Sequence, residues 1–450
     1  MNCPRVLIAG TSSGSGKTTA VCAILSLLKR RGLKVNALKC GPDYLDPTFH
    51  ETVTGVSCTN LDPFFCGEDL LKYLLCENAG ERLTVIEGVM GYYDGTGESG
   101  SDNSTYTVAK LTKTPTVLVI DAKGASTSLI ATLEGFMNYT SDSGIVGVLF
   151  SLISPMNYLN IKSKINSRFG ARVAPVGYIP ELPDDCLIPS RHLGLVSAPE
   201  IGDIEEKMSK IADICEKTID IDALVLLADA AEELSFKAPA VPRREPIKIA
   251  VAFDRAFFFY YRDTLRLFEK MGAEIKFFSP LENEPIPCGC SGLLIGGGYP
   301  ELYAERLEAN TIAKNSVAEA IRDGMPTVAE CGGFQYLGNE LCGKKMCGVL
   351  SHESYAAGKL VRFGYVTLRS KKDGLLGSAG TTLRGHEFHY YDSTLSGDDF
   401  TATKLSGKTW ECAVMTETMY AGYPHLYLYS NIESAEAFYK KCVEYGEREK

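Results

Sequence analysis

The sequence lacks any long apolar run and any excess of positive charge. No run approaches the roughly 20 apolar residues that a membrane-spanning helix needs. The N-terminus enters a strand-like segment at once and shows no secretory pattern. The formal net charge of −10 argues against a general nucleic-acid binder and against a protein of acidic membrane surfaces. We therefore expect a cytoplasmic protein without nucleic-acid or membrane partners. The oligomeric state has no signal in the sequence, and a monomer or a homodimer is expected.

Paired cysteines are also missing. The 15 cysteines are odd in number and are scattered without any C-x-x-C pair. In a soluble chain of 450 residues they are typical of buried, reduced thiols in the cytoplasm.

Short apolar runs instead alternate with amphipathic stretches, which indicates βαβ units and parallel sheets with helices on both faces. The length exceeds what one core holds, so two or three domains are expected. Prolines 239, 242 and 246 indicate an exposed linker. We predict a doubly wound α/β domain over residues 1–237, a linker over 238–246 and a second α/β domain over 247–450. The main expected strands are residues 6–9, 35–38, 84–86, 116–120, 145–150, 176–179, 247–253, 274–278, 292–295 and 326–329.

A glycine-rich loop follows the first expected strand and precedes a helix, as in a phosphate-binding loop (P-loop). Its glycines let backbone N–H groups face anionic oxygens, Lys17 can reach the terminal phosphates, and Thr18 can hold Mg²⁺. The usual first glycine would be residue 11, which is Thr11, whereas Gly10 stands one place earlier. The residues expected to hold the nucleotide are Gly10, Thr11, Gly14, Gly16, Lys17, Thr18, Thr19 and Lys39.

Acidic residues follow two further strands of the first half. Asp43 and Asp46 come after residues 35–38, and Glu87 closes residues 84–86. A carboxylate at the end of a buried strand costs too much desolvation to serve packing, and Mg²⁺ prefers such oxygen ligands. We therefore predict a metal site of Thr18, Asp43 and Glu87. A role of Asp43 and Asp46 as turn or helix-cap residues stays open.

The second half carries a different centre. Cys331 stands at a strand-to-helix junction before Gly332, an arrangement that lifts a nucleophile into a pocket. The helix N-terminus should lower the pKa of the thiol and, with Gly297, Gly298 and Gly332, provide an oxyanion site. His425 is the expected base. We predict a cysteine nucleophile.

Two polar clusters have weaker patterns. His386 and His389 are three residues apart among strand-like residues, which does not match the helical H-E-x-x-H zinc motif. Arg191 and His192 follow a proline-containing loop. We expect His386 and His389 to make polar contacts with a substrate or across the domain interface. Arg191 and His192 could contact an anionic substrate or nucleotide, and a surface or helix-cap role stays open for them.

These motifs together are specific enough to indicate a family. The chain resembles the cobyrinate a,c-diamide synthases over nearly its whole length, in GTSSGSGKTT, KCGPDYLDP, EGVMGYYDG, DAKGASTS, IPSRHLGLVSAPE, AVAFDRAFFFYYRDTL, FSPLENEP, GGGYPE, AECGGFQYL and GHEFHYY.

The resemblance implies an ATP-dependent amide-forming domain, similar to dethiobiotin synthetase, followed by a flavodoxin-like class I glutamine amidotransferase domain. It implies Mg²⁺, ATP, L-glutamine and a corrinoid whose a- and c-side-chain carboxylates are amidated. Asp46 and Asp94 match positions linked to carboxylate activation, Cys331 matches the glutaminase nucleophile, and His425 matches its base.

Two positions depart from related proteins. Tyr427 stands where class I amidotransferases usually carry a glutamate, so a Cys–His dyad is expected, and Ser151 replaces an asparagine that commonly reads the nucleotide base. The same chemistry on nickel-sirohydrochlorin or hydrogenobyrinate is an alternative. A more distant alternative is a P-loop switch ATPase with a degenerate amidotransferase domain.

Overall fold

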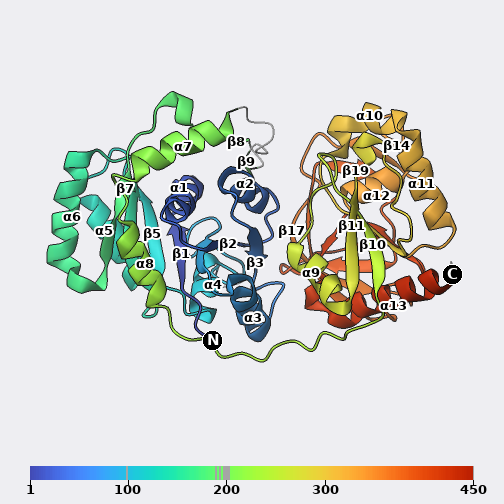
Figure 1. Ribbon diagram of the computed structural model, residues 1–450, viewed down its shortest axis with the longest axis horizontal. Coiled ribbons are helices and arrows are strands. Elements are labelled where there is room, and N and C mark those ends of the chain that lie inside the picture. Colours follow the sequence, from blue (N-terminus) through green and yellow to red (C-terminus); the bar gives the residue numbers. More distant parts are fainter. Residues whose placement is uncertain (98–99, 188–189, 192–193, 196–202, 449–450) are drawn as a thin grey trace. The chain divides into compact units, whose positions relative to one another are not determined.

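The computed structural model describes residues 1–97, 100–187, 190–191, 194–195 and 203–448 (Figure 1). The chain divides into two compact units, Met1–Pro239 and Ala240–Lys450. Residues 230–246 form neither helix nor strand. Among the described helices, none has both the length and the apolar character needed to cross a bilayer.

In the described part of the first unit, one seven-stranded parallel sheet has the order β3-β2-β4-β1-β5-β6-β7. Its strands are β1 (Arg5–Gly10), β2 (Val35–Cys40), β3 (Cys58–Leu61), β4 (Leu83–Glu87), β5 (Thr116–Asp121), β6 (Ile145–Ser151) and β7 (Ala174–Ile179). The six strands predicted in this half are confirmed, and β3 is additional. A short pair, β8 (Ser190–Arg191) and β9 (Gly194–Leu195), lies outside this sheet.

Helices cover both faces of this sheet (Figure 1). The helices are α1 (Lys17–Arg30), α2 (Leu45–Thr54), α3 (Glu68–Ala79), α4 (Thr105–Leu111), α5 (Ser128–Asn138), α6 (Pro155–Phe169), α7 (Ile204–Cys215) and α8 (Ile221–Asp229). In α1, Val21, Ile24, Leu25 and Leu28 recur at helical spacing and are fully buried in a core shared with α2, α7 and α8. Burying such side chains stabilises the unit by about 1.5–3 kcal/mol each.

The strand order explains where this unit can carry a site. Strands β2, β4 and β1 are neighbours, and all three run in the same direction. Their carboxyl ends therefore lie side by side, and the segments that follow them, including the P-loop after β1, meet at one sheet edge.

The second unit is built on a six-stranded sheet in its described part, with the order β11-β10-β12-β13-β23-β22. Only the β22–β23 pair is antiparallel in this sheet. The strands are β10 (Ile247–Ala252), β11 (Ala273–Phe278), β12 (Gly292–Ile295), β13 (Thr327–Glu330), β22 (Val414–Met415) and β23 (Met419–Gly422). This strand order is that of flavodoxin-like folds, and the fold class predicted for both halves is confirmed.

The helices of this unit are α9 (Arg262–Met271), α10 (Ala304–Ala309), α11 (Thr311–Arg322), α12 (Gly332–Leu337) and α13 (Ile432–Arg448). Two smaller sheets complete it. One has the order β21-β20-β17-β18-β24 and contains β17 (Arg362–Ser370), β18 (Thr382–His389), β20 (Phe400–Thr403), β21 (Thr409–Cys412) and β24 (His425–Leu426). The other contains β14 (Glu340–Leu341), β15 (Lys344–Lys345), β16 (Glu353–Ala356) and β19 (Tyr391–Ser393).

Candidate functional sites

The loop after β1 is shaped by close packing around its glycines. A Cβ on Gly10 would stand 2.2 Å from Ser15 Oγ and 2.9 Å from Lys17 Nζ. Gly14 and Gly16 have φ of 77° and 92°, in the left-handed region that favours glycine. Gly10 is therefore required although it precedes the usual first position. Thr11 bridges the loop to the sheet, donating its backbone N–H to Val119 O at 3.2 Å.

Lys17 lies at the start of α1 and is buried. Its ammonium donates to Ser12 O at 2.9 Å and to Met90 O at 2.6 Å, so the side chain curls back over the loop. Burial and the nearby charge of Lys39 lower the pKa of Lys17 to about 8. An anion in the loop would offset that desolvation. Thr19 follows in the first turn of α1 and is partly buried.

Glu87, at the end of β4, is fully buried. Thr18 Oγ1 donates to Glu87 Oε1 at 2.7 Å, Lys39 Nζ lies 3.1 Å from the same oxygen, and His50 Nε2 contacts Oε2. Burial disfavours the carboxylate, but Lys39 and His50 outweigh it and hold the pKa of Glu87 below its ordinary value. Thus Glu87 is ionised and joins the P-loop helix to β2 and α2.

The two aspartates after β2 have different surroundings. Asp43 Oδ1 accepts the backbone N–H groups of Leu45 and Asp46 at 2.8 and 3.1 Å, which is a helix-cap arrangement at the start of α2. Burial, followed by the charge of Asp46, raises the pKa of Asp43 to about 6. Asp46 pairs with Lys39, whose Nζ lies 2.5 Å from Asp46 Oδ2. The cap alternative thus has direct structural support for Asp43.

The loop after β4 closes over the P-loop. Asp94 Oδ2 accepts the backbone N–H of Gly91 at 3.0 Å, and a Cβ on Gly91 would stand 3.0 Å from Thr11 O. Ser151, at the end of β6, donates to Ser15 O at 2.9 Å. Ser151 therefore supports the P-loop backbone in this structure.

The residues predicted to hold Mg²⁺ are Thr18, Asp43 and Glu87, and their oxygens can be compared with the ligands that this ion prefers. The hydroxyl of Thr18 and the carboxylate of Glu87 are in contact, and both are hard oxygen ligands, so this pair fits the ion. Asp43 has one oxygen engaged in the cap, which leaves the other to serve as a ligand. Within the described residues, no group of three or more His, Cys, Asp or Glu side chains could hold a metal by itself. A magnesium ion here would depend on phosphate oxygens as well.

Arg191 and His192 cannot be placed relative to this site. The structure gives the backbone of Arg191 in β8 but not its side chain, and His192 lies outside the described residues. Their predicted contacts with a substrate stay predictions.

In the second unit, Cys331 occupies a strained turn between β13 and α12. Its φ and ψ are 50° and −103°, a conformation that non-glycine residues rarely adopt and that costs on the order of 1–3 kcal/mol. Two backbone hydrogen bonds hold it there, from Cys331 N to Gly422 O at 2.7 Å and from Gln335 N to Cys331 O at 3.0 Å. The predicted elbow is therefore present.

His425 lies in β24 and is 2% exposed, and its Nδ1 is 3.5 Å from Glu330 Oε2. The other oxygen of Glu330 accepts the backbone N–H of Leu426 at 3.1 Å. Glu330 directly precedes Cys331, so one carboxylate lies next to both predicted members of the dyad. Tyr427, by contrast, donates to Asp263 at 3.3 Å, away from this pair.

The three glycines predicted for the oxyanion site pack tightly at the elbow. A Cβ on Gly297 would stand 2.4 Å from His425 Cε1. One on Gly298, whose φ is 153°, would stand 2.1 Å from Ala256 O, and one on Gly332 would stand 3.3 Å from the backbone nitrogen of Gly298. The loop after β12 thus lies directly against both Gly332 and His425.

The expectation of a lowered thiol pKa is wrong for the free protein. Burial, and then the carboxylates of Glu301, Glu387 and Glu330, raise the pKa of Cys331, while a backbone hydrogen bond from Gly332 acts in the opposite direction. The helix N-terminus is outweighed because the thiol is desolvated among negative charges.

The two histidines of β18 face different neighbours. His386 pairs with His425 across the β18–β24 register, and burial, with His425 and Lys404, lowers its pKa to about 3. His389 lies parallel to the ring of Tyr423 at 4.0 Å, and its nitrogens contact Tyr391 O at 2.6 Å and Glu387 Oε2 at 3.2 Å. These partners account for the position of His389 without a substrate, so the predicted substrate contacts are not tested.

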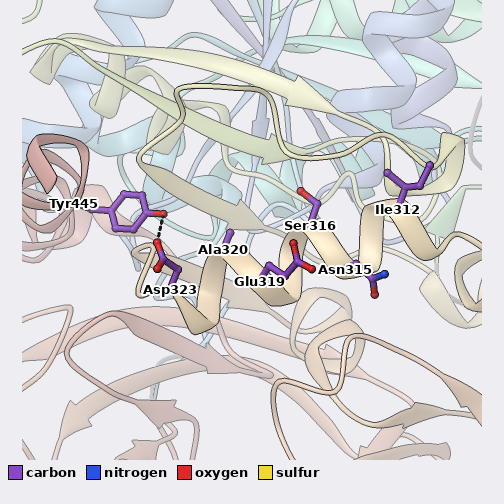
Figure 2. Close-up of a pocket in the computed structure, with 7 residues that line it drawn as sticks. All are labelled: Ile312, Asn315, Ser316, Glu319, Ala320, Asp323 and Tyr445. Atoms are coloured by element: carbon purple, nitrogen blue, oxygen red, sulfur yellow. Dashed lines mark hydrogen bonds between the residues drawn. The ribbon is translucent and has the colours of Figure 1, made fainter. Parts of the chain in front are cut away.

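A cavity of about 510 Å³ is lined by residues of α11, by Asp323 and by Tyr445, and none of its lining residues is a predicted site residue (Figure 2). Tyr445 donates to Asp323 at 3.0 Å at its rim. Its lining contains no cysteine, histidine or cationic side chain that matches either predicted chemistry.

Comparison with known proteins first defines the class. Residues 6–196 match the family described as CobQ/CobB/MinD/ParA nucleotide binding domain, and residues 248–432 match the family described as CobB/CobQ-like glutamine amidotransferase domain. The chain thus joins a P-loop nucleotide-binding domain to a glutamine amidotransferase domain.

Full-length relatives then define the family. The chain is 38% identical to a cobyrinate a,c-diamide synthase of Thermoplasma volcanium, over 100% of this chain and 99% of the relative. It is 37% identical to that of Listeria monocytogenes serotype 4b, over 95% and 97%. It is 36% identical to that of Caldanaerobacter subterraneus, over 99% and 100%. The chain belongs to the cobyrinate a,c-diamide synthase family and is a glutamine-dependent amidating ligase.

Two residues beside these sites were not predicted from the sequence. His50 contacts Glu87 and lies four residues after Asp46, on the same face of α2, a helical spacing that could have indicated it. Glu330 lies beside His425 because β24 follows β23, the neighbour of β13. That proximity depends on tertiary pairing and has no local signal.

Proposed function

We propose that this protein uses ATP and L-glutamine to convert the a- and c-side-chain carboxylates of cobyrinate into amides, a step of cobalamin synthesis. The observation that supports it most is the presence, in one chain, of a strained cysteine elbow and a P-loop flanked by carboxylates. One centre can release ammonia, and the other can activate an acid. The names of the full-length relatives support cobyrinate as the substrate.

In the glutaminase half, the thiol of Cys331 passes its proton to His425 and attacks the side-chain amide carbon of glutamine. Backbone N–H groups at Gly297, Gly298 and Gly332 are proposed to stabilise the tetrahedral oxyanion. His425 then protonates the leaving nitrogen, and ammonia departs. Water hydrolyses the thioester to glutamate and restores the thiol. Glu330, at 3.5 Å from His425, orients the imidazole.

In the synthetase half, a carboxylate of the macrocycle attacks the terminal phosphorus of ATP, which gives an acyl phosphate and ADP. Ammonia then attacks the acyl carbon, and phosphate leaves with the C–O electron pair. Activation is required because a carboxylate is a poor acyl donor. Lys17 neutralises phosphate charge, and Asp46 and Asp94 hold positions for the reacting carboxylate and its intermediate. Mg²⁺, held by Thr18 and Glu87 with Asp43, would supply further charge neutralisation at the phosphates.

Nickel-sirohydrochlorin and hydrogenobyrinate would be amidated by the same residues, and a panel of macrocycles with mass detection separates them from cobyrinate. A P-loop switch ATPase with a degenerate second domain would not require the strained conformation of Cys331. That strain favours an active amidotransferase.

The proposal is tested with Cys331→Ser and Lys17→Ala. We expect Cys331→Ser to lose synthesis driven by glutamine but to keep synthesis driven by ammonium salts, because only nitrogen release needs the thiol. We expect Lys17→Ala to fail with either nitrogen source. Glutamine-driven turnover by Cys331→Ser would refute the nucleophile, and normal turnover by Lys17→Ala would refute the P-loop role.

A further inference from the structure

Three carboxylates raise the pKa of the Cys331 thiol, and they differ in how they are satisfied. Glu330 accepts the Leu426 N–H and lies beside His425. Glu387 contacts His389 at 3.2 Å. For Glu301, no ion pair with a cation of the described residues is formed, and the carboxylate is hydrogen-bonded only by its own backbone N–H. Glu301 is thus a carboxylate near the nucleophile that lacks a counter-ion.

Glu301 is held at this place by the packing of its loop. It belongs to the turn Pro300–Tyr303, which follows the oxyanion glycines. A Cβ on Gly332 would stand 2.9 Å from Pro300 Cδ, so the residue before Glu301 packs directly on the residue after Cys331. Burial, and then the charge of Glu301, raise the pKa of Tyr391 of β19 to about 12, so Glu301 also lies near this strand.

The surroundings of Glu301 disfavour a lone negative charge. The side chain is only partly exposed, and burial raises its pKa to about 7. A second acceptor near the thiol is also unsatisfied, because Glu387 is 2% exposed and its Oε1 has no hydrogen-bond partner. A buried carboxylate oxygen without a hydrogen-bond donor is costly. The position of such oxygens beside the nucleophile therefore suits a ligand that carries several N–H groups.

We propose that Glu301 binds the α-ammonium group of L-glutamine and thereby selects an amino acid, not a simple amide, for Cys331. The inference rests on the proposed glutaminase function. L-glutamine carries one cationic group, the α-ammonium, and Glu301 is the carboxylate near Cys331 that is both partly accessible and without a cationic partner among the described residues. The bound cation also offsets the charge that disfavours the thiolate, so the nucleophile becomes more acidic when the correct substrate is present.

The test compares L-glutamine with glutaramate, which has the same side-chain amide and terminal carboxylate but no α-amino group. We expect Glu301→Gln to lower kcat/KM for L-glutamine about 10- to 100-fold, the range of a charged hydrogen bond. The same variant should change glutaramate hydrolysis much less. Glu301→Asp should recover part of the activity toward L-glutamine, and ammonium-driven synthesis should be unchanged in both variants.

Two further variants test whether the effect is specific to Glu301. Glu305→Gln is the matched control, because Glu305 is exposed, pairs with Lys344 at 3.2 Å and lies four residues away on α10. It should leave both substrates unaffected. Glu387→Gln tests the neighbouring carboxylate, and a loss specific to L-glutamine in Glu387→Gln but not in Glu301→Gln would overturn the assignment.

Further outcomes would overturn either the role of Glu301 or the proposed glutaminase function. Equal losses for L-glutamine and glutaramate in Glu301→Gln would show a structural role and overturn the proposal, as would wild-type protein that uses both substrates equally well. Failure of wild-type protein to hydrolyse L-glutamine would instead refute the proposed function itself. The two failures are therefore distinguishable before any variant is compared.

Discussion

Lys39 is a buried cation of the first unit that pairs with two carboxylates, those of Asp46 and Glu87. It is 3% exposed and lies between Asp46 Oδ2 at 2.5 Å and Glu87 Oε1 at 3.1 Å. Burial opposes its charge, but the two carboxylates raise the pKa of Lys39 well above its ordinary value. Removing a single member of such a group leaves uncompensated buried charge, whereas the intact group adds little net stability.

We therefore expect Lys39→Met to destabilise the first unit by about 3–5 kcal/mol. The measurement is the free energy of opening from hydrogen exchange of the α1 amides, which reports this unit alone. Lys39→Met combined with Asp46→Asn should recover part of the loss, since one of the stranded carboxylates is gone.

Lys110→Met is the control for Lys39→Met, because Lys110 pairs with Asp142 at 3.0 Å on the surface. An exposed pair adds little to stability because solvent screens its charges. Equal effects of Lys39→Met and Lys110→Met on α1 exchange would contradict the buried-charge account.

At the scale of elements, the loop after β12 and the short strand β24 fit together through one glycine. A Cβ on Gly297 would stand 2.4 Å from His425 Cε1, and the Gly297 carbonyl accepts the backbone N–H groups of Phe258 and Phe259 at 2.9 and 3.0 Å. The loop cannot retreat without breaking those bonds, so an added methyl group must displace the imidazole.

We expect Gly297→Ala to lower glutamine-driven synthesis by about 100-fold, the cost of misplacing a catalytic group by roughly 1 Å. Ammonium-driven synthesis should persist. Gly135→Ala is the control, since a Cβ there meets no atom within 4 Å in helix α5 and should leave both activities intact. Loss of both activities in Gly297→Ala would mean that the change disrupts folding, and normal glutamine turnover would mean that the loop tolerates a side chain.

Parallel strands were predictable because they are buried runs that end in polar residues. The runs at residues 84–86 and 326–329 are of this kind, and the structure extends them to Glu87 and Glu330. The β3 strand was missed because its sequence, CTNL, is short and half polar. The β17–β18 pair was missed as a sheet because its strands mix buried and exposed residues and pair antiparallel across a long register.

Several candidate site residues were predictable for the same reason, because they lie at or after the ends of buried strands. Glu87 and Cys331 stand at strand ends, and Lys17 opens the helix after the loop that follows β1, so the sequence itself marks the edge of a parallel sheet at each of them. The partners His50 and Glu330 are set by packing between segments that are distant in sequence. The pKa of Cys331 was predicted in the wrong direction because a helix terminus is a local feature, whereas burial and the charges of Glu301 and Glu387 arise only in the folded chain.

At the scale of the whole molecule, the two units place their reactive residues in the same way within their sheets, although the residues suit different chemistry. Each places its reactive residues after adjacent parallel strands, β1, β2 and β4 in the first unit and β12, β13 and β23 in the second. The first edge combines cations and carboxylates that suit phosphate and metal, and the second surrounds a thiol with carboxylates. Their sensitivity to pH should therefore differ, and each unit can be followed separately.

The second unit should respond to acid through two buried histidines. Burial lowers the pKa of His352 to about 4, and burial with His425 and Lys404 lowers that of His386 to about 3. In the unfolded chain both titrate near their ordinary pKa of about 6.5. The unfolded state then binds more protons as the pH falls below that value, so each histidine lowers the free energy of unfolding, by about 2 kcal/mol between pH 7 and pH 5.

This loss is measurable with the single tryptophan of the chain, Trp410, which lies in β21 of the second unit. Burial raises the pKa of Glu301 to about 7, which acts in the opposite sense, so the wild type is compared with the double variant His352→Gln/His386→Gln. Urea unfolding followed by Trp410 fluorescence should lose about 4 kcal/mol more between pH 7 and pH 5 in the wild type than in the variant. An identical pH dependence in the two proteins would mean that both histidines accept protons in the folded unit.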